Sequence, residues 1–264
     1  MVYESNKIRT SEKQLEEIFK QLAGIPCLIG GWAVHHIVNK NFEKANGIKY
    51  IGSQDIDIGF NINNQWNEEQ LRKSEFSAAI KTIESMGFES VGSRFVKNFD
   101  FDTGKELTPE ESKRLPMHQL HQIFIDLVVD YIHPEIKSLL GFVPIDEPLL
   151  SLVFQDKMYT LTTLFKRTVL LPKPHVLLAM KLNSAPKRDK ENKRIKDIAD
   201  IYALLWYSDI TLTKLKNHLF SIYPKEKVKK IIQKFTKENI SIVSTMIGVN
   251  TQEITRVLIE LTRS

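Results

Sequence analysis

The sequence contains very little cysteine and no long apolar run. Cys27 is its one cysteine, which excludes an internal disulfide and any metal site built from a pair of cysteines. No stretch approaches the roughly eighteen apolar residues of a membrane-spanning helix. The first residues also lack the charged-then-apolar pattern of a signal peptide. We therefore expect a cytoplasmic protein with no membrane partner.

Several familiar catalytic motifs are missing as well. The sequence has neither a Gly-x-Ser-x-Gly elbow nor a Walker loop. His35 and His36 are adjacent, so on a helix they diverge by about 100° and do not suit one metal ion. His118 and His121 are three residues apart but have no third ligand at a suitable spacing. The histidines therefore do not predict a metal site.

The charge is unevenly distributed along the chain. The 264 residues are 42% hydrophobic and 26% charged, the balance of a globular protein with one large or two small domains. Residues 1–159 hold 17 Lys/Arg against 23 Asp/Glu, whereas residues 160–264 hold 20 against 9. A basic C-terminal part favours an anionic partner such as nucleic acid or a polyphosphate. A solvated, lysine-rich helical surface is the alternative.

The N-terminal part alternates between helix and strand patterns. Apolar residues at three- and four-residue spacing predict helices over 11–22 and 68–86. Short apolar or alternating runs predict strands at 27–29, 55–60 and 122–130, with one or two more within 88–99. The stretch 149–164 suits either a strand or a helix.

The pattern changes near Pro172, inside the run Leu170-Leu171-Pro172-Lys173-Pro174. Beyond it the strand signal ends, and helices are predicted over 175–184 and 195–207, followed by two or three more. We predict an α/β (α+β) protein. Its domain of residues 1–172 has a mixed sheet with flanking helices, and residues 173–264 form a helical C-terminal domain.

Two aspartates share one face of the predicted strand at 55–60. Side chains alternate across a strand, so Asp55 and Asp57 point to the same side, roughly 6 to 7 Å apart. Carboxylates this close repel each other, and a divalent cation with a preference for oxygen ligands, Mg²⁺ or Mn²⁺, would offset the repulsion. Two solvated carboxylates on an exposed strand are the alternative for an isolated Asp-x-Asp.

A third carboxylate lies within the apolar run at 122–130. An unpaired, charged Asp126 there would cost on the order of several kcal/mol unless it were protonated, paired or bound to a metal. Asp130 has the same strand parity and could take the same role. We prefer Asp126 because its surroundings are more apolar.

A glycine pair and a serine stand where a phosphate could bind. Gly30-Gly31 separates an apolar strand from a helix start, where backbone N–H groups can approach an anion. Ser53 precedes Asp55 by two residues and can offer its hydroxyl to the same phosphate. An ordinary tight turn and a loop serine are the alternatives.

Together, Gly30-Gly31, Ser53-Gln54-Asp55-Ile56-Asp57 and Asp126 resemble the nucleotidyltransferase superfamily typified by DNA polymerase β. The resemblance implies a nucleotidyltransferase fold and a nucleoside triphosphate substrate held by Gly30, Gly31 and Ser53. It implies that Asp55, Asp57 and Asp126 are catalytic and bind Mg²⁺ or Mn²⁺. The enzyme would transfer a nucleoside monophosphate to a hydroxyl acceptor and release pyrophosphate.

A second resemblance lies in the C-terminal part. Leu177 to Leu182, then Arg188, then Lys196-Asp197-Ile198-Ala199-Asp200-Ile201-Tyr202 are similar to the AbiEii-type toxin nucleotidyltransferases. The resemblance implies that Lys181 is catalytic and reaches the triphosphate together with Arg188. It favours RNA, such as a tRNA end, as the acceptor, and implies an antitoxin protein as a partner.

The sequence departs from the superfamily pattern in two places. The 24-residue gap from Gly31 to Asp55 is longer than the pattern suggests, so 42–50 is a candidate inserted loop. Gly31 also stands where many members have a serine. These departures keep open a non-catalytic module that binds nucleotide or nucleic acid. A transferase acting on a small antibiotic-type molecule is the other alternative, because the sequence does not show the acceptor.

Overall fold

The chain forms two compact units, which a computed structural model describes over residues 5–263. The sheet unit comprises residues 5–29 and 52–171, and the helical unit comprises residues 30–51 and 172–263. The expected mixed α/β fold, with a mixed sheet and helices after it, is confirmed. Pro172 lies where the chain passes into the helical unit, and the segment 30–51 belongs to that unit as well.

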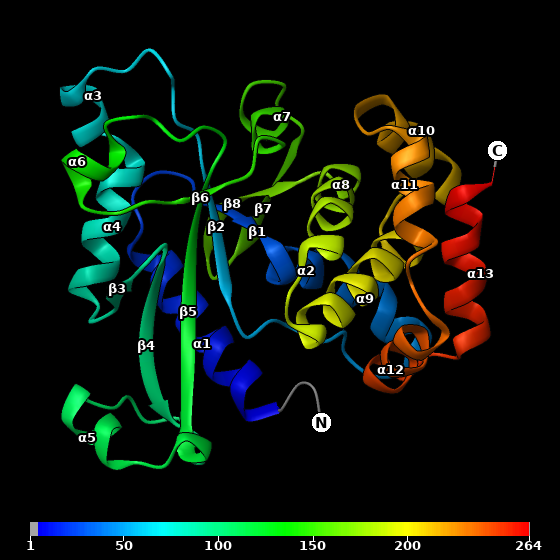
Figure 1. The fold of residues 1–264 in the computed structure, drawn as a ribbon, viewed down its shortest axis with the longest axis horizontal. Coiled ribbons are helices and arrows are strands. Elements are labelled where there is room, and N and C mark those ends of the chain that lie inside the picture. The colour runs from blue at the N-terminus through cyan, green and yellow to red at the C-terminus, as the bar shows by residue number, and fades with distance from the viewer. Residues whose placement is uncertain (1–4, 264) are drawn as a thin grey trace. The chain divides into compact units, whose positions relative to one another are not determined.

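The sheet unit is built on one mixed sheet (Figure 1). Its strand order is β3-β4-β5-β2-β1-β8-β7, with β6 paired to β5 off this path. The strands are β1 (Cys27–Ile29), β2 (Ile56–Phe60), β3 (Glu89–Val91), β4 (Arg94–Asp100), β5 (Leu120–Val129), β6 (Ile145–Asp146), β7 (Tyr159–Leu164) and β8 (Arg167–Pro172).

The centre of the sheet brings the two predicted acidic strands together. β2 and β5 are parallel neighbours, and their register sets Asp57 opposite Asp126. β4 runs antiparallel to β5 on the other side, and β1 runs antiparallel to β2. Because paired residues of adjacent strands point to the same face, the register places carboxylates of β2 and β5 side by side.

Six α-helices belong to the described part of the sheet unit. They are α1 (Ser5–Gln21), α3 (Glu68–Arg72), α4 (Glu75–Ser85), α5 (Pro109–Arg114), α6 (Ile136–Leu140) and α7 (Leu150–Phe154). The helix expected over 68–86 is two helices, because the Ser74 hydroxyl accepts the Ser77 N–H and starts α4 anew. The ambiguous stretch 149–164 contains both α7 and β7. Phe60 of β2 packs edge-on against Phe76 of α4 in the core.

The helical unit packs α2 (Gly30–Asn46) and α8 (Pro174–Ser184) around the buried α9 (Glu191–Tyr207). Four further helices follow in the described chain, α10 (Leu212–Ile222), α11 (Lys225–Ile232), α12 (Lys237–Ile247) and α13 (Thr251–Thr262), where two or three are expected. The candidate loop 42–50 begins as the last turns of α2. Within residues 5–263, every helix is too short or too polar to cross a membrane.

Candidate active site on the sheet

A row of charged side chains crosses three strands of the sheet unit. The β4–β5 register pairs Phe95 with Ile125, and one residue further along it sets Arg94 opposite Asp126. Asp126 is in turn opposite Asp57 on β2. Asp55 precedes Asp57 by two residues and therefore belongs to the same face. We call Arg94, Asp126, Asp57 and Asp55 the acidic row.

Arg94 bridges two carboxylates of this row. Its Nε lies 2.5 Å from Asp126 Oδ1, and its Nη2 lies 2.9 Å from Asp126 Oδ2, which is a bidentate ion pair. The same Nη2 lies 3.1 Å from Asp55 Oδ2. Carboxylates from β5 and from the start of β2 therefore converge on a single nitrogen atom. The side chains of Arg94, Asp55 and Asp126 are 25%, 20% and 11% exposed, so solvent still reaches the row.

The surroundings of Arg94 hold it in its charged form. Burial opposes the positive charge, but the Asp126 and Asp55 carboxylates outweigh burial and raise the pKa of Arg94 above its ordinary value. The guanidinium also lies over the Phe124 ring, 4.4 Å from its centroid. Arg94 follows Gly92 (φ +65°), whose left-handed backbone makes the tight turn between β3 and β4.

The donor chemistry of the row suits a hard divalent cation, but the present arrangement has a guanidinium between two of the donors. Three carboxylates and one guanidinium give the four side chains a formal charge of −2. Across residues 5–263, the structure places no three His, Cys, Asp or Glu side chains where they could hold a metal ion. A metal ion would therefore require Arg94 to release at least one carboxylate.

Asp130, the alternative third carboxylate, has a different environment at the end of β5. Its Oδ1 accepts the backbone N–H of Ile62 at 2.7 Å, which ties the chain after β2 to the end of β5. Burial raises the pKa of Asp130 above its ordinary value. Asp126 contacts Arg94 in the acidic row, whereas Asp130 holds a backbone segment.

The predicted phosphate-binding residues lie in both units. Ser53 is buried in the sheet unit just before β2. Gly30 and Gly31 open α2 of the helical unit, and Gly30 has φ +65°, which favours glycine at this position. The predicted contact of these residues with one phosphate stays a prediction.

Lys181 and Arg188 belong to a charged cluster in the helical unit. The Lys181 ammonium lies 2.8 Å from Asp197 Oδ1 and 2.8 Å from Asp200 Oδ2. Lys196 pairs with Asp200, whose Oδ1 also accepts the Tyr50 hydroxyl at 2.8 Å. The Arg188 Nε lies 2.7 Å from Asp197 Oδ2. The predicted contact of Lys181 and Arg188 with a triphosphate stays a prediction.

The pKa shifts in this cluster follow from burial and pairing. Burial opposes the charge of Lys181, but Asp197 and Asp200 outweigh it and raise the pKa of the ammonium. Burial likewise opposes the charge of Asp197, and Lys181 and Arg188 outweigh it and lower the pKa of the carboxyl. For Lys196, burial dominates and lowers the pKa. The network keeps Lys181 and Asp197 ionised.

Sequence reasoning missed Arg94 as a site residue. Nothing in the local stretch Ser93-Arg94-Phe95 marks it as functional, because its role depends on the pairing of β4 with β5. The available signal is weaker, a tight turn at Gly92 followed by alternating residues that predict a strand next to the Asp126 strand.

Comparison with known proteins adds no argument about the function of the chain. No family model matches the sequence. No curated protein matches it either. Among solved structures, the chain is similar to an antigenic nucleotidyltransferase-like protein from Paracoccidioides brasiliensis. The TM-score is 0.38 and the identity 15%, over 83% of this chain and 90% of that chain. The proposal that follows therefore stands on the acidic row and on the sequence motifs.

Proposed function

We propose that the chain is a metal-dependent nucleotidyltransferase, which moves a nucleoside monophosphate from a nucleoside triphosphate to a hydroxyl acceptor. The observation that carries the proposal is the convergence of carboxylates from β2 and β5 on one face of the sheet. Phosphoryl-type transfer depends mainly on positioned charge, and carboxylates on adjacent strands provide a rigid frame for it. When bound, Mg²⁺ or Mn²⁺ would neutralise charge on the triphosphate.

The residues of the row have distinct roles in this proposal. Asp55 and Asp57 hold the cation, and Asp126 either completes its ligand set or accepts the proton of the acceptor hydroxyl. The acceptor oxygen forms a bond to the α-phosphorus, the bond from that phosphorus to the bridging oxygen of the β-phosphate breaks, and pyrophosphate leaves with the bonding pair. Arg94 releases Asp126 and can then pair with a phosphate oxygen through its planar fork.

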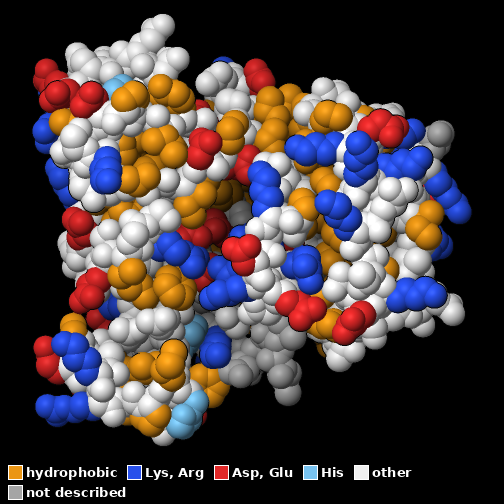
Figure 2. Space-filling view, viewed as in Figure 1, with side chains coloured by type: hydrophobic (Ala, Val, Ile, Leu, Met, Phe, Trp, Pro, Cys, Tyr) orange, Lys and Arg blue, Asp and Glu red, His pale blue; other side chains and the backbone are white. Residues whose placement is uncertain are grey.

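RNA is the favoured acceptor. Figure 2 shows Lys and Arg side chains spread over the visible face of the helical unit, and residues 160–264 hold 20 Lys/Arg against 9 Asp/Glu. A phosphate backbone recognised in this way binds much more weakly as salt rises, whereas a small antibiotic-type acceptor does not. Measuring acceptor binding at low and moderate salt distinguishes the two. The similarity to AbiEii-type toxins extends the proposal to a toxin held inactive by an antitoxin protein.

The experiment compares wild type with Asp57→Asn and Asp130→Asn. Each protein is incubated with each labelled nucleoside triphosphate, Mg²⁺ and total tRNA, and label transfer is followed. We expect transfer by wild type, a loss of about a hundredfold or more in Asp57→Asn, and near-normal transfer in Asp130→Asn. The control removes a carboxylate of the same sheet that lies outside the acidic row.

One observation favours a second function, a binding module without catalysis. Arg94 already neutralises part of the charge of Asp55 and Asp126, as it would in a site that works without a metal ion. Absence of transfer by wild type across RNA and small hydroxyl acceptors, together with binding of a nucleoside triphosphate, would overturn the enzymatic proposal in favour of this one.

A further inference from the structure

A cavity lies in the sheet unit, at the opposite end of β2 from the acidic row. Its volume is about 720 Å³, within the range of small-molecule sites. It is lined by Gly59, Phe60 and Asn61, at and just after the end of β2. At about 3.3 Å per residue, Asn61 lies roughly 13 Å along the chain from Asp57. The cavity is therefore separate from the row.

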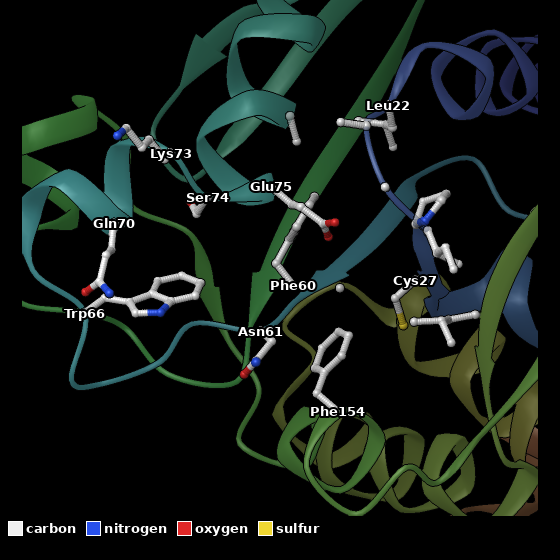
Figure 3. Close-up of a pocket in the computed structure, with 17 residues that line it drawn as sticks. Leu22, Cys27, Phe60, Asn61, Trp66, Gln70, Lys73, Ser74, Glu75 and Phe154 are labelled. Atoms are coloured by element: carbon white, nitrogen blue, oxygen red, sulfur yellow. The ribbon is translucent and has the colours of Figure 1, made fainter.

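Three aromatic residues contribute to its wall. Phe60, Trp66 and Phe154 come from three different segments and line the same space. Figure 3 shows Trp66 and Gln70 on one side of the cavity, Cys27 on the other, and Phe154 with Asn61 below them. Rings placed in this way suit a flat ligand, because aromatic faces stack on planar rings.

The Trp66 segment is anchored from behind. The Glu135 N–H donates to His133 Nδ1 at 3.2 Å, so His133 carries its proton on Nε2. His133 Nε2 then donates to the Trp66 carbonyl oxygen at 3.0 Å. Asn67 and Gln70 form a capping box that fixes the start of α3 next to this tryptophan. These hydrogen bonds fix the backbone on the Trp66 side of the cavity.

Polar groups at the rim offer hydrogen bonds to a ligand. Gln70 uses its Oε1 to accept the Asn67 N–H, which leaves the amide NH₂ for other contacts. Among the residues that the structure describes, neither the Asn61 side chain nor the Glu75 carboxylate hydrogen-bonds to another residue. Glu75 reaches towards Gly24 across the cavity, since a Cβ on Gly24 would overlap Glu75 Oε1. The rim combines one carboxylate with two amides.

Little in the cavity would bind a phosphate. Lys73 is the one basic residue among those that line it, and its ammonium pairs with Glu69 Oε1 at 2.6 Å. Glu75 would repel an anion. The chemistry therefore favours a neutral planar ring over a phosphorylated one.

We propose that this cavity binds a guanine-type base, stacked against Trp66 and held at its edge by Glu75. Guanine carries a ring N–H next to an amino group, and a carboxylate accepts from both at once, as carboxylates do from other paired donors. Adenine has no such pair of adjacent donors. The proposal is independent of nucleotidyl transfer, because it involves neither the acidic row nor a metal ion.

The test measures the dissociation constants of guanosine, inosine and adenosine by ligand-observed NMR and calorimetry, without metal or triphosphate. We expect guanosine to bind wild type about tenfold tighter than adenosine, with inosine between them. Glu75→Gln should remove the preference for guanosine. Trp66→Leu should weaken the binding of all three nucleosides.

Glu84→Gln is the matched control, since Glu84 is an exposed carboxylate on the same helix, α4. It should bind guanosine as wild type does. Equal affinities for guanosine and adenosine in wild type, or equal guanosine affinities in Glu75→Gln and Glu84→Gln, would overturn the proposal. Either result would leave the Asp57→Asn transfer experiment unaffected, so the two proposals fail separately.

Discussion

The sheet unit and the helical unit each contain a cluster of charged side chains, and the two clusters are built differently. In the helical unit, the side chains of Lys181, Asp197 and Asp200 are 9%, 2% and 0% exposed. Each carboxylate there contacts at least two cations. In the sheet unit, the acidic row holds three carboxylates and one guanidinium and is open to solvent.

This difference separates a structural cluster from a candidate site. Buried ions need partners on every side, because the cost of removing them from water is offset only by close pairing. Arg188, at 37% exposed, is the part of this cluster that solvent reaches. The buried pairs of Lys181 with Asp197 and Asp200 join α8 to α9, and we expect them to stabilise the packing of these helices. A row whose guanidinium is a quarter exposed can instead exchange this cation for another one, which is what a metal or substrate site requires.

The largest expected effect is a loss of folding stability when Lys181 is replaced. Lys181→Met leaves Asp197 and Asp200 with fewer cations in a buried site, and breaking such a pair costs about 3 to 5 kcal/mol. We therefore expect the free energy of unfolding, measured by urea denaturation and circular dichroism, to fall by that amount.

Lys187→Met provides the control, since Lys187 is exposed and follows α8 closely in the chain. Its free energy of unfolding should stay within about 0.5 kcal/mol of wild type. If Lys181→Met were as stable as Lys187→Met, the cluster would not be structural, and Lys181 would become a candidate for direct contact with substrate.

Much of the fold can be predicted from the sequence because its signals are local. The alternation of Asp55 to Phe60 and the apolar run around Asp126 each predict a strand, and both strands are present. The break between α3 and α4 is harder to predict, because the apolar period continues past Ser74 while its hydroxyl caps a new helix. The sequence pattern does not show whether the apolar period or the helix cap determines the local structure.

The candidate site is only partly predictable for a different reason. Asp-x-Asp and Asp126 stand out because carboxylates are unusual in apolar strands. Arg94 does not, because its contacts depend on the register of β4 against β5, and register is a long-range property. The partners of Lys181 are similarly hidden, since α8 and α9 must pack before Asp197 can meet it.

A second effect, of intermediate size, is on the pH dependence of stability. Burial lowers the pKa of His35, His36 and His175, all in the helical unit, from 6.5 to about 4. Between these values the unfolded chain binds more protons than the folded one, so stability is lost as pH falls from 6.5 to 4. At about 1.4 kcal/mol per pKa unit each shift corresponds to roughly 3 kcal/mol. Because solvent reaches the half-buried His35 and His36 and screens their charge, we expect a total loss of about 3 kcal/mol. In the sheet unit Asp130 acts in the opposite sense, because its raised pKa favours the folded state on acidification.

Hydrogen exchange followed by mass spectrometry, corrected for intrinsic rates, measures this effect separately in each unit. Protection of α2 and α9 should fall between pH 6.5 and 4.5 more than protection of β2 and β5. His36→Gln should reduce the loss in the helical unit, whereas His118→Gln, at an exposed residue of the sheet unit, should not change it. Equal losses in both units would contradict this difference between them.

The smallest effect concerns the cation of the acidic row. If Arg94 and a divalent ion compete for Asp55 and Asp126, Arg94→Gln removes the competitor and restores charge to both carboxylates. We expect Mn²⁺, titrated without nucleotide and followed by electron paramagnetic resonance, to bind about tenfold tighter, or about 1.4 kcal/mol.

The control is Arg114→Gln, which replaces an exposed arginine on α5 and should bind Mn²⁺ as wild type does. Adding Asp57→Asn to Arg94→Gln should abolish the gain. Weaker or unchanged Mn²⁺ binding in Arg94→Gln would instead make the guanidinium the permanent cation of the row. The acidic row would then resemble the Lys181 cluster, because both would be complete without a metal ion.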